Sequence, residues 1–512
     1  MTHRKIFVCI AGLLAAAGLL SGCYNEAMGD TKKEETVLKW ICGGVGEQRD
    51  SEKVWKKFNE ELQKYLPDTK VEFECIPTKN YGEKWKLMST SQQEMDIVWC
   101  SWQSDFVSEV KKGSYMPLDN LIKEYAPSIK EKIPAEMLKK QTVERRLYSI
   151  PCMQQMVSYV STLNFDYDLY EKYKDYINPD ELSAFFASHN KMDSECWDKI
   201  EQYIKLFADN GDLYNGVIGF ESHAEKGYEW VRNPYKIEDY GDDYTVVNYY
   251  RTPEYKLFIE RYSDWYKKGY IRKDFANIDR NTGFYPISGE GNYLIGQGCV
   301  PSAKEIEAKR KSGERLSVRV PFYDEHYIPY GAAASSIAIS SSCKNPEKAI
   351  KLLELMNTEK GKELYNILVY GIEGEHYEKV TNNKVRPVGY TKQPAANAPY
   401  GQYAWALGNS FNAYQIYSEW DDPSLDSDFI KKLNSDARES KLMGFSLDTT
   451  PIKLELKQID AVVEEYGDMK QMIISENCAE MYDEFVEKLK LAGDDKVVAE
   501  IQRQIDEWRN KN

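Results

Sequence analysis

The sequence contains little histidine and none of the common catalytic motifs. Five of its 512 residues are histidine, and four of these, beyond residue 100, are not paired at metal-ligand spacing: His189, His223, His326 and His376. H-E-x-x-H, G-x-S-x-G and G-x-x-x-x-G-K patterns are all missing. The nearest dinucleotide-like stretch, 289–294, lacks the third glycine, and the acidic turn 209–212 lacks EF-hand spacing. We therefore expect no catalytic residue, no metal ion and no cofactor.

Cysteine pairs at close spacing are also missing. None of the ten cysteines forms a C-x-x-C pair, and several lie within apolar, strand-like runs such as 40–42, 73–76 and 97–100. A free cysteine in such a run behaves as a small hydrophobic residue. We expect most of the thiols to be buried, with one or two disulfides left open as an alternative and no pairing assignable.

Long apolar runs are limited to one, Ile6 to Leu20, which is shorter than the ~20 residues of a membrane-spanning helix. Arg4 and Lys5 precede it, and the polar segment from Tyr24 follows it, which is the layout of a secretory signal. The run ends in Leu20-Ser21-Gly22-Cys23, a lipobox. We predict a signal peptide over 1–22, lipid on Cys23, and a flexible tether over 23–36. The alternative is a soluble secreted protein with a chance cysteine at this position.

Net charge and aromatic content limit the classes of ligand that the protein is expected to bind. The net charge of −15 argues against nucleic acid and anionic lipid as ligands. Tyrosine is abundant, with 38 residues against 17 phenylalanines, and there are 11 tryptophans. Tyrosine and tryptophan are favoured where one face of the ring is apolar and one edge is wet, as in binding clefts. A tyrosine-rich exterior without a specific ligand is the alternative.

The beginning of the predicted mature chain alternates between strand and helix. The expected strands are 37–43, 70–76 and 96–100, and the expected helices are 50–66 and 81–93. This order predicts a parallel α/β sheet. Ligands of open α/β sheets bind beyond the carboxyl ends of the strands. We therefore expect Glu47 and Trp102, which follow the first and third strands, to contact a ligand.

Later segments return to strand and helix. Strands are expected at 316–321 and 336–342, and a helix is expected from Pro346 with Asn345 as its cap. The segment 400–412 mixes aromatic residues, glycines and amides without a helical period. We expect it to face a ligand, with Trp405 stacking on it and with Asn409 and Asn412 binding its polar groups. A core position for Trp405 is the alternative.

Several motifs follow one another in a familiar order: a lipobox, a βαβαβ start with a glycine-rich turn, GSYMPLDNL at 113–121, LYSIP at 147–151, NFD at 164–166, SCKNPEKAIKLLELMN at 342–357 and YGIEGEHY at 370–377. This order resembles that of extracellular solute-binding proteins of family 1, the substrate-capture subunits of ABC importers. Within this family the chain is most similar to a Gram-positive lipoprotein subgroup with a long C-terminal region.

This resemblance implies an α/β, two-lobed periplasmic-binding-protein-like fold, with an interlobe ligand cleft and a multi-strand hinge. We expect lobe 1 over 37–153 and 322–358, and lobe 2 over 154–321 and 359–512 with a C-terminal helical extension. The chain is expected to cross between the lobes near 151–156, near 321–324, and after the helix that begins at Pro346.

The resemblance further implies a carbohydrate ligand, an oligosaccharide, delivered to the transmembrane subunits of an ABC permease by a lipid-anchored monomer on the outer face of the cytoplasmic membrane. From lobe 2 we expect Trp230 and Gln297 to contact the ligand, and Tyr330 to do so from the turn after the second crossing. Two alternatives stay open: the same fold binding a peptide or another oligomer, and a surface-anchored glycoside hydrolase.

Overall fold

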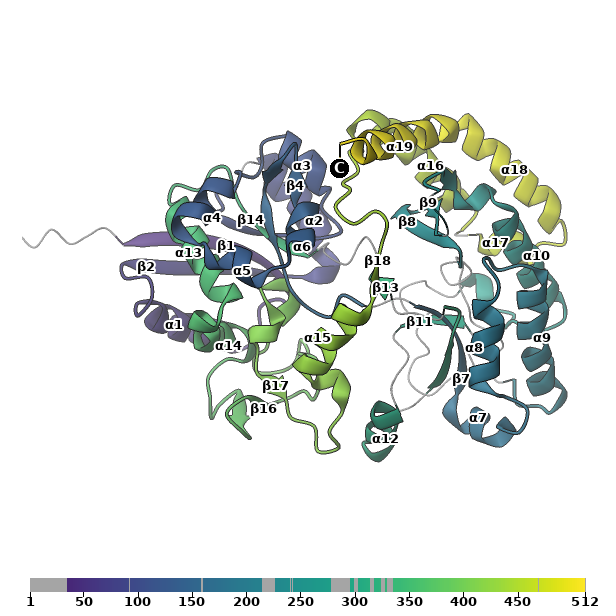
Figure 1. The fold of residues 1–512 in the computed structure, drawn as a ribbon, viewed down its shortest axis with the longest axis horizontal. Coiled ribbons are helices and arrows are strands. Elements are labelled where there is room, and N and C mark those ends of the chain that lie inside the picture. The colour runs from purple at the N-terminus through teal and green to yellow at the C-terminus, as the bar shows by residue number, and fades with distance from the viewer. Residues whose placement is uncertain are drawn as a thin grey trace, which may run out of the picture. The chain divides into compact units, whose positions relative to one another are not determined.

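The computed structural model describes most of the chain beyond the predicted signal peptide and tether (Figure 1). Cys23 lies outside the described residues. No helix within the described parts is long and apolar enough to cross a membrane. The structure describes residues 35–91, 93–157, 160–213, 226–239, 241, 243–277, 295–298, 303–313, 317–323, 327–328, 335–467 and 469–511.

A five-stranded sheet lies at the centre of the first hydrophobic core. Its strand order is β2-β1-β3-β14-β6. β1 is parallel to both β2 and β3, as the strand–helix alternation predicts, whereas β14 is antiparallel to β3 and β6. The sheet is therefore mixed, because a strand from much later in the chain inserts between β3 and β6. The bounds are β1 (Thr36–Gly44), β2 (Thr69–Pro77), β3 (Ile97–Cys100), β6 (Ser149–Pro151) and β14 (Ser336–Ile339).

Amphipathic helices pack around this sheet. α1 (Ser51–Leu62) buries Val54, Phe58 and Leu62, which recur on one helical face. α13 (Pro346–Asn357) begins at the expected proline, but the Asn345 side chain makes no capping hydrogen bond. The other helices of this part are α2 (Thr78–Ser91), α3 (Phe106–Lys111), α4 (Asp119–Tyr125), α5 (Ser128–Lys132), α6 (Ala135–Lys140), α14 (Lys362–Tyr370) and α15 (Ser427–Asp436).

Short strands and 3₁₀ turns complete this part of the chain. β4 pairs with β5, and β16 lies between β15 and β17. The bounds are β4 (Thr142–Val143), β5 (Arg146–Leu147), β15 (Tyr377–Lys379), β16 (Lys384–Pro387), β17 (Gln415–Ile416), η6 (Ala404–Ala406), η7 (Ser410–Asn412) and η8 (Pro423–Leu425).

A second hydrophobic core is mainly helical and carries two small sheets. β7 lies between β11 and β12 in one sheet, and β9 lies between β8 and β10 in the other. The strands are β7 (Val160–Asp166), β8 (Tyr228–Arg232), β9 (Tyr235–Glu238), β10 (Val246–Asn248), β11 (Ile295–Gly298) and β12 (Ser317–Pro321). The helices are α7 (Tyr167–Tyr173), α8 (Pro179–Ala187), α9 (Ser194–Asp209), α10 (Pro253–Lys267), α16 (Lys453–Glu465), α17 (Lys470–Ile474), α18 (Cys478–Leu491) and α19 (Asp494–Arg509).

The chain passes between the two cores at positions that differ in part from those expected. Buried residues change core between Val157 and Leu163, and again between Phe322 and Ile337. The expected assignment of everything after residue 358 to lobe 2 needs correction, because 364–414 packs in the first core. The buried face of α14 contacts α1 and α13, which draws this segment back to the first sheet. The change to the second core comes at about 437–442, beside β18 (Arg438–Glu439) and β13 (Tyr327–Ile328).

Cysteine and tyrosine both contribute to the interior. The seven cysteines in the described parts of the chain are free and buried, as expected. Many tyrosine rings lie in the core with the hydroxyl bound to a main-chain carbonyl. Neither the binding cleft nor the tyrosine-rich exterior considered from the sequence predicts this. Tyr365 donates to Ala404 at 2.7 Å, and Tyr400 donates to Leu368 at 2.8 Å. Each such tyrosine fills apolar space and also satisfies a carbonyl oxygen of an irregular segment.

Candidate functional site

Two glutamines, Gln48 at the end of the glycine-rich turn after β1 and Gln402 from a distant segment, tie this turn to the segment 400–412. Gln402 accepts a hydrogen bond from the Val45 N–H at 3.1 Å and donates to the Gly46 carbonyl at 2.8 Å. Gln48 accepts from the Gly401 N–H at 2.9 Å. The segment 400–412 therefore lies against the carboxyl end of β1. It was expected near a ligand, but the glutamines that place it there were not predicted.

A close contact inside the sheet explains why residue 43 is a glycine. A Cβ atom at Gly43 would lie 2.0 Å from Cε3 of Trp99, which has no exposed surface. Trp99 donates from its indole nitrogen to Ser335 at 2.8 Å, and the Ser335 hydroxyl donates to the Trp405 carbonyl at 2.9 Å. Gly43 thus makes room for a tryptophan that links β3 to the segment of Trp405.

Trp102 lies in the turn that follows β3, and hydrogen bonds of neighbouring residues fix this turn. The Ser101 N–H donates to the Ser104 hydroxyl at 3.0 Å, which closes the turn. Gln103 accepts from the Gly82 N–H at 2.7 Å and donates to the Thr78 carbonyl at 2.9 Å, which ties the turn to α2. The Trp102 side chain is left 59% exposed. A rigid backbone with an exposed indole is suited to stacking on a flat apolar ligand face.

Aromatic residues gather around this indole. Trp102 lies 5.6 Å from Trp99 and 6.0 Å from Trp405 between ring centroids, and Tyr403 stacks on Trp405 at 5.2 Å with planes inclined by 16°. We call Trp102, Tyr403 and Trp405 the aromatic surface. Trp405 is half-buried and packs against the core that contains Trp99. Glu47 is exposed at the end of the glycine turn.

Asn409 and Asn412 make hydrogen bonds within the fold. The Asn409 side chain caps η7 by accepting from the Phe411 N–H at 3.0 Å. The Asn412 side-chain amide is directed to the Met356 carbonyl at 3.5 Å, and the Asn412 main-chain carbonyl accepts from Asn366 at 3.0 Å. Both side chains are buried. The expectation that they also bind a ligand stays a prediction.

The other residues expected to contact the ligand are Trp230 and Gln297 from lobe 2 and Tyr330 from the turn after the second crossing. Trp230 in β8 is 40% exposed, and the Lys236 ammonium lies 4.1 Å from its ring centroid. Gln297 belongs to β11, and Tyr330 lies outside the described residues. The relation of Trp230 to the aromatic surface, and the cleft between lobes, stay predictions.

A hollow that the sequence did not indicate lies beside β16, β17 and η8. Its volume is about 530 Å³, and charged side chains of both signs line it. One of them, Asp422, accepts from Lys392 at 3.0 Å. The lining includes Lys304, Lys384, Asp421, Asp422, Asp426 and Phe429. A hollow built from short strands and turns leaves no periodic pattern in a sequence, which is why it was missed.

Titratable groups below the aromatic surface are not activated for catalysis. Burial raises the pKa of Cys100, at the end of β3, to about 12. Burial also raises the pKa of Tyr81, whose hydroxyl donates to the Trp99 carbonyl, well above its usual range. A thiol or phenol with a raised pKa stays protonated and is a poor nucleophile. These groups therefore support the fold.

The mixed sheet with its second, helical core is the fold of two-domain solute-binding proteins. The chain is similar to the N-glycan transport solute-binding protein NgtS from Streptococcus pneumoniae, with a TM-score of 0.72, 22% identity, and coverage of 93% of this chain and 100% of that one. An extracellular solute-binding protein from Bifidobacterium longum subsp. infantis gives a TM-score of 0.59 at 13% identity, with 92% and 98% covered. The expected fold class is confirmed.

Full-length sequence similarity points to the same class. A curated Streptococcus pneumoniae protein described as a carbohydrate ABC transporter substrate-binding protein is 25% identical over 521 residues, which span 98% of this chain and 97% of that one. Residues 441–510 match a family described as a domain of unknown function, DUF3502. The chain is accordingly similar over nearly its full length to a substrate-binding protein of a carbohydrate ABC transporter. These relatives are transport proteins and not enzymes, in agreement with the sequence.

Proposed function

We propose that the protein captures an oligosaccharide outside the cell and delivers it to the permease of an ABC importer. The observation that carries this proposal is the exposed indole of Trp102 on a fixed turn at the carboxyl end of β3, within an aromatic surface. Sugar rings stack their apolar faces on aromatic side chains, while polar groups at the rim take their hydroxyls. Glu47 is the candidate for the second role.

The relatives support a glycan over other ligands. NgtS structures in complex with Man1GlcNAc and with Man5GlcNAc match this chain with TM-scores of 0.65 and 0.64. The net charge of −15 also disfavours polyanionic glycans, because like charges repel. We therefore propose a neutral oligosaccharide, with mannose-containing glycans as the first to test. A peptide ligand is the alternative outcome of the same experiment.

Titration calorimetry on the purified mature protein tests this function. The panel holds Man5GlcNAc, a neutral fructan, a polyanionic uronic-acid oligomer and a mixture of short peptides. We expect saturable binding of at least one neutral glycan and none of the polyanion. No binding to any neutral glycan, together with saturable binding of the peptides, would overturn the carbohydrate proposal.

Anchoring at the membrane is a separate proposal that rests on the lipobox. We propose cleavage between Gly22 and Cys23, lipid on Cys23, and a monomer held on the outer face of the cytoplasmic membrane. Two acyl chains hold a protein where a single chain is marginal, at ~0.8 kcal/mol per buried methylene. Cys23→Ala should release the protein into the medium or leave an uncleaved precursor. Unchanged membrane fractionation and processing of this variant would refute the anchor.

A further inference from the structure

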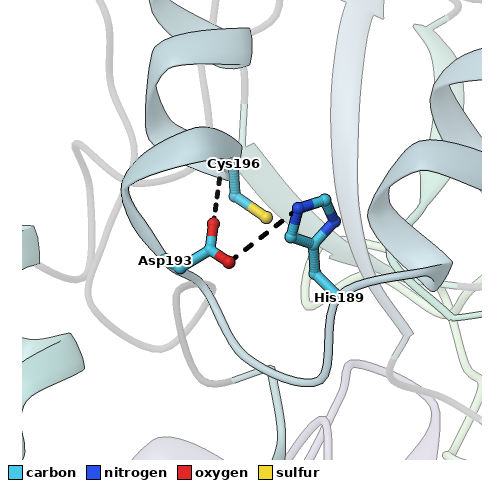
Figure 2. Close-up of side chains that lie close together, drawn as sticks. All are labelled: His189, Asp193 and Cys196. Carbon is cyan, nitrogen blue, oxygen red and sulfur yellow. Dashed lines mark hydrogen bonds and ion pairs between the residues drawn. The ribbon is translucent and has the colours of Figure 1, made fainter.

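The loop between α8 and α9 and the first turn of α9 bring four potential metal ligands together. His189, Asp193 and Cys196 each offer one donor atom, and these atoms all lie within 4.8 Å of one another (Figure 2). The His189 Nε2 atom lies 3.8 Å from an Asp193 oxygen and 3.5 Å from a Glu195 oxygen. The sequence did not indicate this, because one histidine with an aspartate and a cysteine matches no common metal motif.

The tautomer of His189 is fixed by the fold. Its Nδ1 atom lies 2.9 Å from the Phe185 carbonyl, and a carbonyl only accepts, so Nδ1 carries a proton. The lone pair of the neutral ring is therefore on Nε2, which faces the carboxylates of Asp193 and Glu195. The imidazole also packs on the Phe185 ring with centroids 4.6 Å apart. A histidine whose second nitrogen donates to a main-chain carbonyl is the usual arrangement of a metal ligand.

The remaining donors are held at the start of α9. Asp193 caps the helix by accepting from the Cys196 N–H at 3.0 Å, which leaves its other oxygen free to turn toward His189 (Figure 2). Cys196 is fully buried, and its sulfur points into the cluster (Figure 2). The carboxylate side is accessible, because the side chains of Asp193 and Glu195 are 49% and 78% exposed. A cation can therefore enter from solvent and meet a sulfur at the inner wall.

We propose that His189, Asp193 and Cys196 bind a Zn²⁺ ion, with the Glu195 carboxylate or a water as the fourth ligand. Imidazole, thiolate and carboxylate are the ligands that Zn²⁺ prefers, at metal–ligand distances of about 2.0–2.3 Å. Tetrahedral geometry at those distances places donor atoms roughly 3.3–3.8 Å apart. The separations of His189 from both carboxylates already fall in this range. The donor atoms of His189, Asp193 and Cys196 lie up to 4.8 Å apart, so metal binding requires a side-chain shift of about 1 Å.

Binding releases a proton from the thiol. Burial, followed by the Asp193 charge, raises the pKa of Cys196 to about 12, so the apo site holds a neutral thiol. The nearby Lys226 ammonium acts in the opposite direction and favours the thiolate. Zn²⁺ replaces the proton on sulfur, and the proton passes to buffer.

Calorimetric titration of the tag-free mature protein with ZnCl₂ tests the site, in a Cys23→Ala background so that the N-terminal thiol cannot compete. We expect one Zn²⁺ per chain and release of about one proton, measured from the heats in two buffers of different ionisation enthalpy. Titration with CoCl₂ should produce a thiolate-to-cobalt charge-transfer band. Zn²⁺ should also raise the melting temperature, because it binds only the folded loop.

Matched variants assign the ligands. Cys196→Ser and His189→Gln should each weaken Zn²⁺ binding at least tenfold, and Cys196→Ser should abolish the cobalt band. Cys478→Ser is the control, because Cys478 is likewise buried at the first turn of a helix in the second core. Asp193→Asn keeps the capping oxygen, so this variant should fold and should bind Zn²⁺ more weakly. Glu195→Gln changes an exposed side chain and should also fold. It should weaken Zn²⁺ binding if Glu195 is the fourth ligand and leave binding unchanged if a water is.

The outcomes separate a built site from adventitious binding. No heat and no rise in melting temperature with the parent protein would overturn the proposal. Binding that is equal in the Cys196→Ser, Cys478→Ser and parent proteins, without a cobalt–thiolate band, would also overturn it. A fall in affinity with His189→Gln but not with Cys196→Ser would refute the proposed ligand set.

Discussion

The indole rings of Trp102 and Trp405 lie 6.0 Å apart between centroids, with their planes inclined by 35°. Trp102 follows β3, and Trp405 belongs to the segment that Gln402 ties to the end of β1. Two distant parts of the chain therefore contribute to one aromatic surface. The two rings differ in burial, because Trp102 is 59% exposed while Trp405 packs against the core. Their substitutions should consequently have different effects.

Trp102→Ala should weaken glycan binding with little loss of stability. An exposed ring contributes little to the core, so we expect a change of less than about 0.5 kcal/mol in the free energy of unfolding. By analogy with ring stacking on bases, the loss in binding should be roughly 1–3 kcal/mol, and 1.4 kcal/mol is tenfold in Kd. Calorimetry with the best glycan and thermal melts measure the two effects. Tyr176→Ala, at a side chain 70% exposed in the other part of the chain, is the control. Unchanged affinity in Trp102→Ala would contradict the placement of the site.

Trp405→Ala should lower both stability and affinity. Its ring stacks on Tyr403 and contacts Trp99 at 5.8 Å, so truncation leaves a partly filled space beside the core. We expect a loss of about 2 kcal/mol in the free energy of unfolding, less than the ~3–5 kcal/mol of a fully buried tryptophan. Trp405→Phe should recover most of the stability. Chemical denaturation of both variants checks this, and a Trp405→Ala protein as stable as the parent would remove the packing role.

Gly43→Ala should destabilise the protein through Trp99. The added methyl would lie 2.0 Å from a buried ring, and forcing extra volume into a packed core costs typically ~1–3 kcal/mol. The cost should be smaller when Trp99 is replaced by Phe, because the phenyl ring does not reach as far. A double-mutant cycle measured by urea denaturation gives this coupling. Equal costs in both backgrounds would show that the methyl is accommodated elsewhere.

The sequence predicts the first sheet well because its elements are regular. The strand expected at 37–43 is β1, and the helix expected from Asp50 is α1. α13 begins at Pro346, as expected from a proline at the first helical position. The antiparallel insertion of β14 was not predicted, because strand pairing depends on contacts between distant segments and not on local pattern.

The site is less predictable than the fold, because irregular segments carry it. Trp102 was proposed from its position after a strand, which topology fixes. The capping role of Asn409 was not predicted, because an asparagine that caps a 3₁₀ turn and one that binds a ligand are identical in sequence. Tyrosines were taken to indicate a wet surface, yet Tyr400 is fully buried and donates to a main-chain carbonyl. Such contacts become visible only when the chain is folded.

Acid should weaken the connection between α1 and the segment after α14. The Ile372 N–H donates to Nδ1 of His376, so Nε2 carries the proton and donates to Asp50 at 3.2 Å. The hydrogen bond from Arg49, with that from His376, lowers the pKa of Asp50 to about 2. A lowered pKa contributes stability above the unfolded value near 4, and that stability is lost as pH falls toward 2.

Asp50→Asn should therefore flatten the acid limb of the stability curve. The difference in unfolding free energy between parent and variant should shrink as pH falls from 5 to about 2, as measured by urea denaturation. Asp428→Asn, at an exposed side chain on α15, is the control. A difference that stays constant over this range would show that Asp50 does not contribute through its charge.

The opposite pH dependence is expected where the chain enters the second core. Arg438 donates to Asp239 at 3.0 Å and to Glu229 at 3.3 Å, and the Lys441 N–H donates to Glu229 at 3.2 Å. Burial, followed by the neighbouring Glu229, raises the pKa of Asp239 to about 7. The folded protein thus keeps a proton that the unfolded chain releases near pH 4. Stability from this group is complete below pH 4 and is lost as pH rises toward 7.

Asp239→Asn, which mimics the protonated acid, should be close to the parent in stability at pH 4 and should gain on it by at least about 1 kcal/mol at pH 8, since one pKa unit corresponds to ~1.4 kcal/mol. Urea denaturation at the two pH values measures the gain. Asp243→Asn is the control, because hydrogen bonds from Thr245 lower the pKa of Asp243 and its substitution should not produce this gain. A parent–variant difference that is the same at pH 4 and pH 8 would mean that Arg438 keeps Asp239 ionised. The 438–441 segment would then be held to β8 and β9 by charge alone.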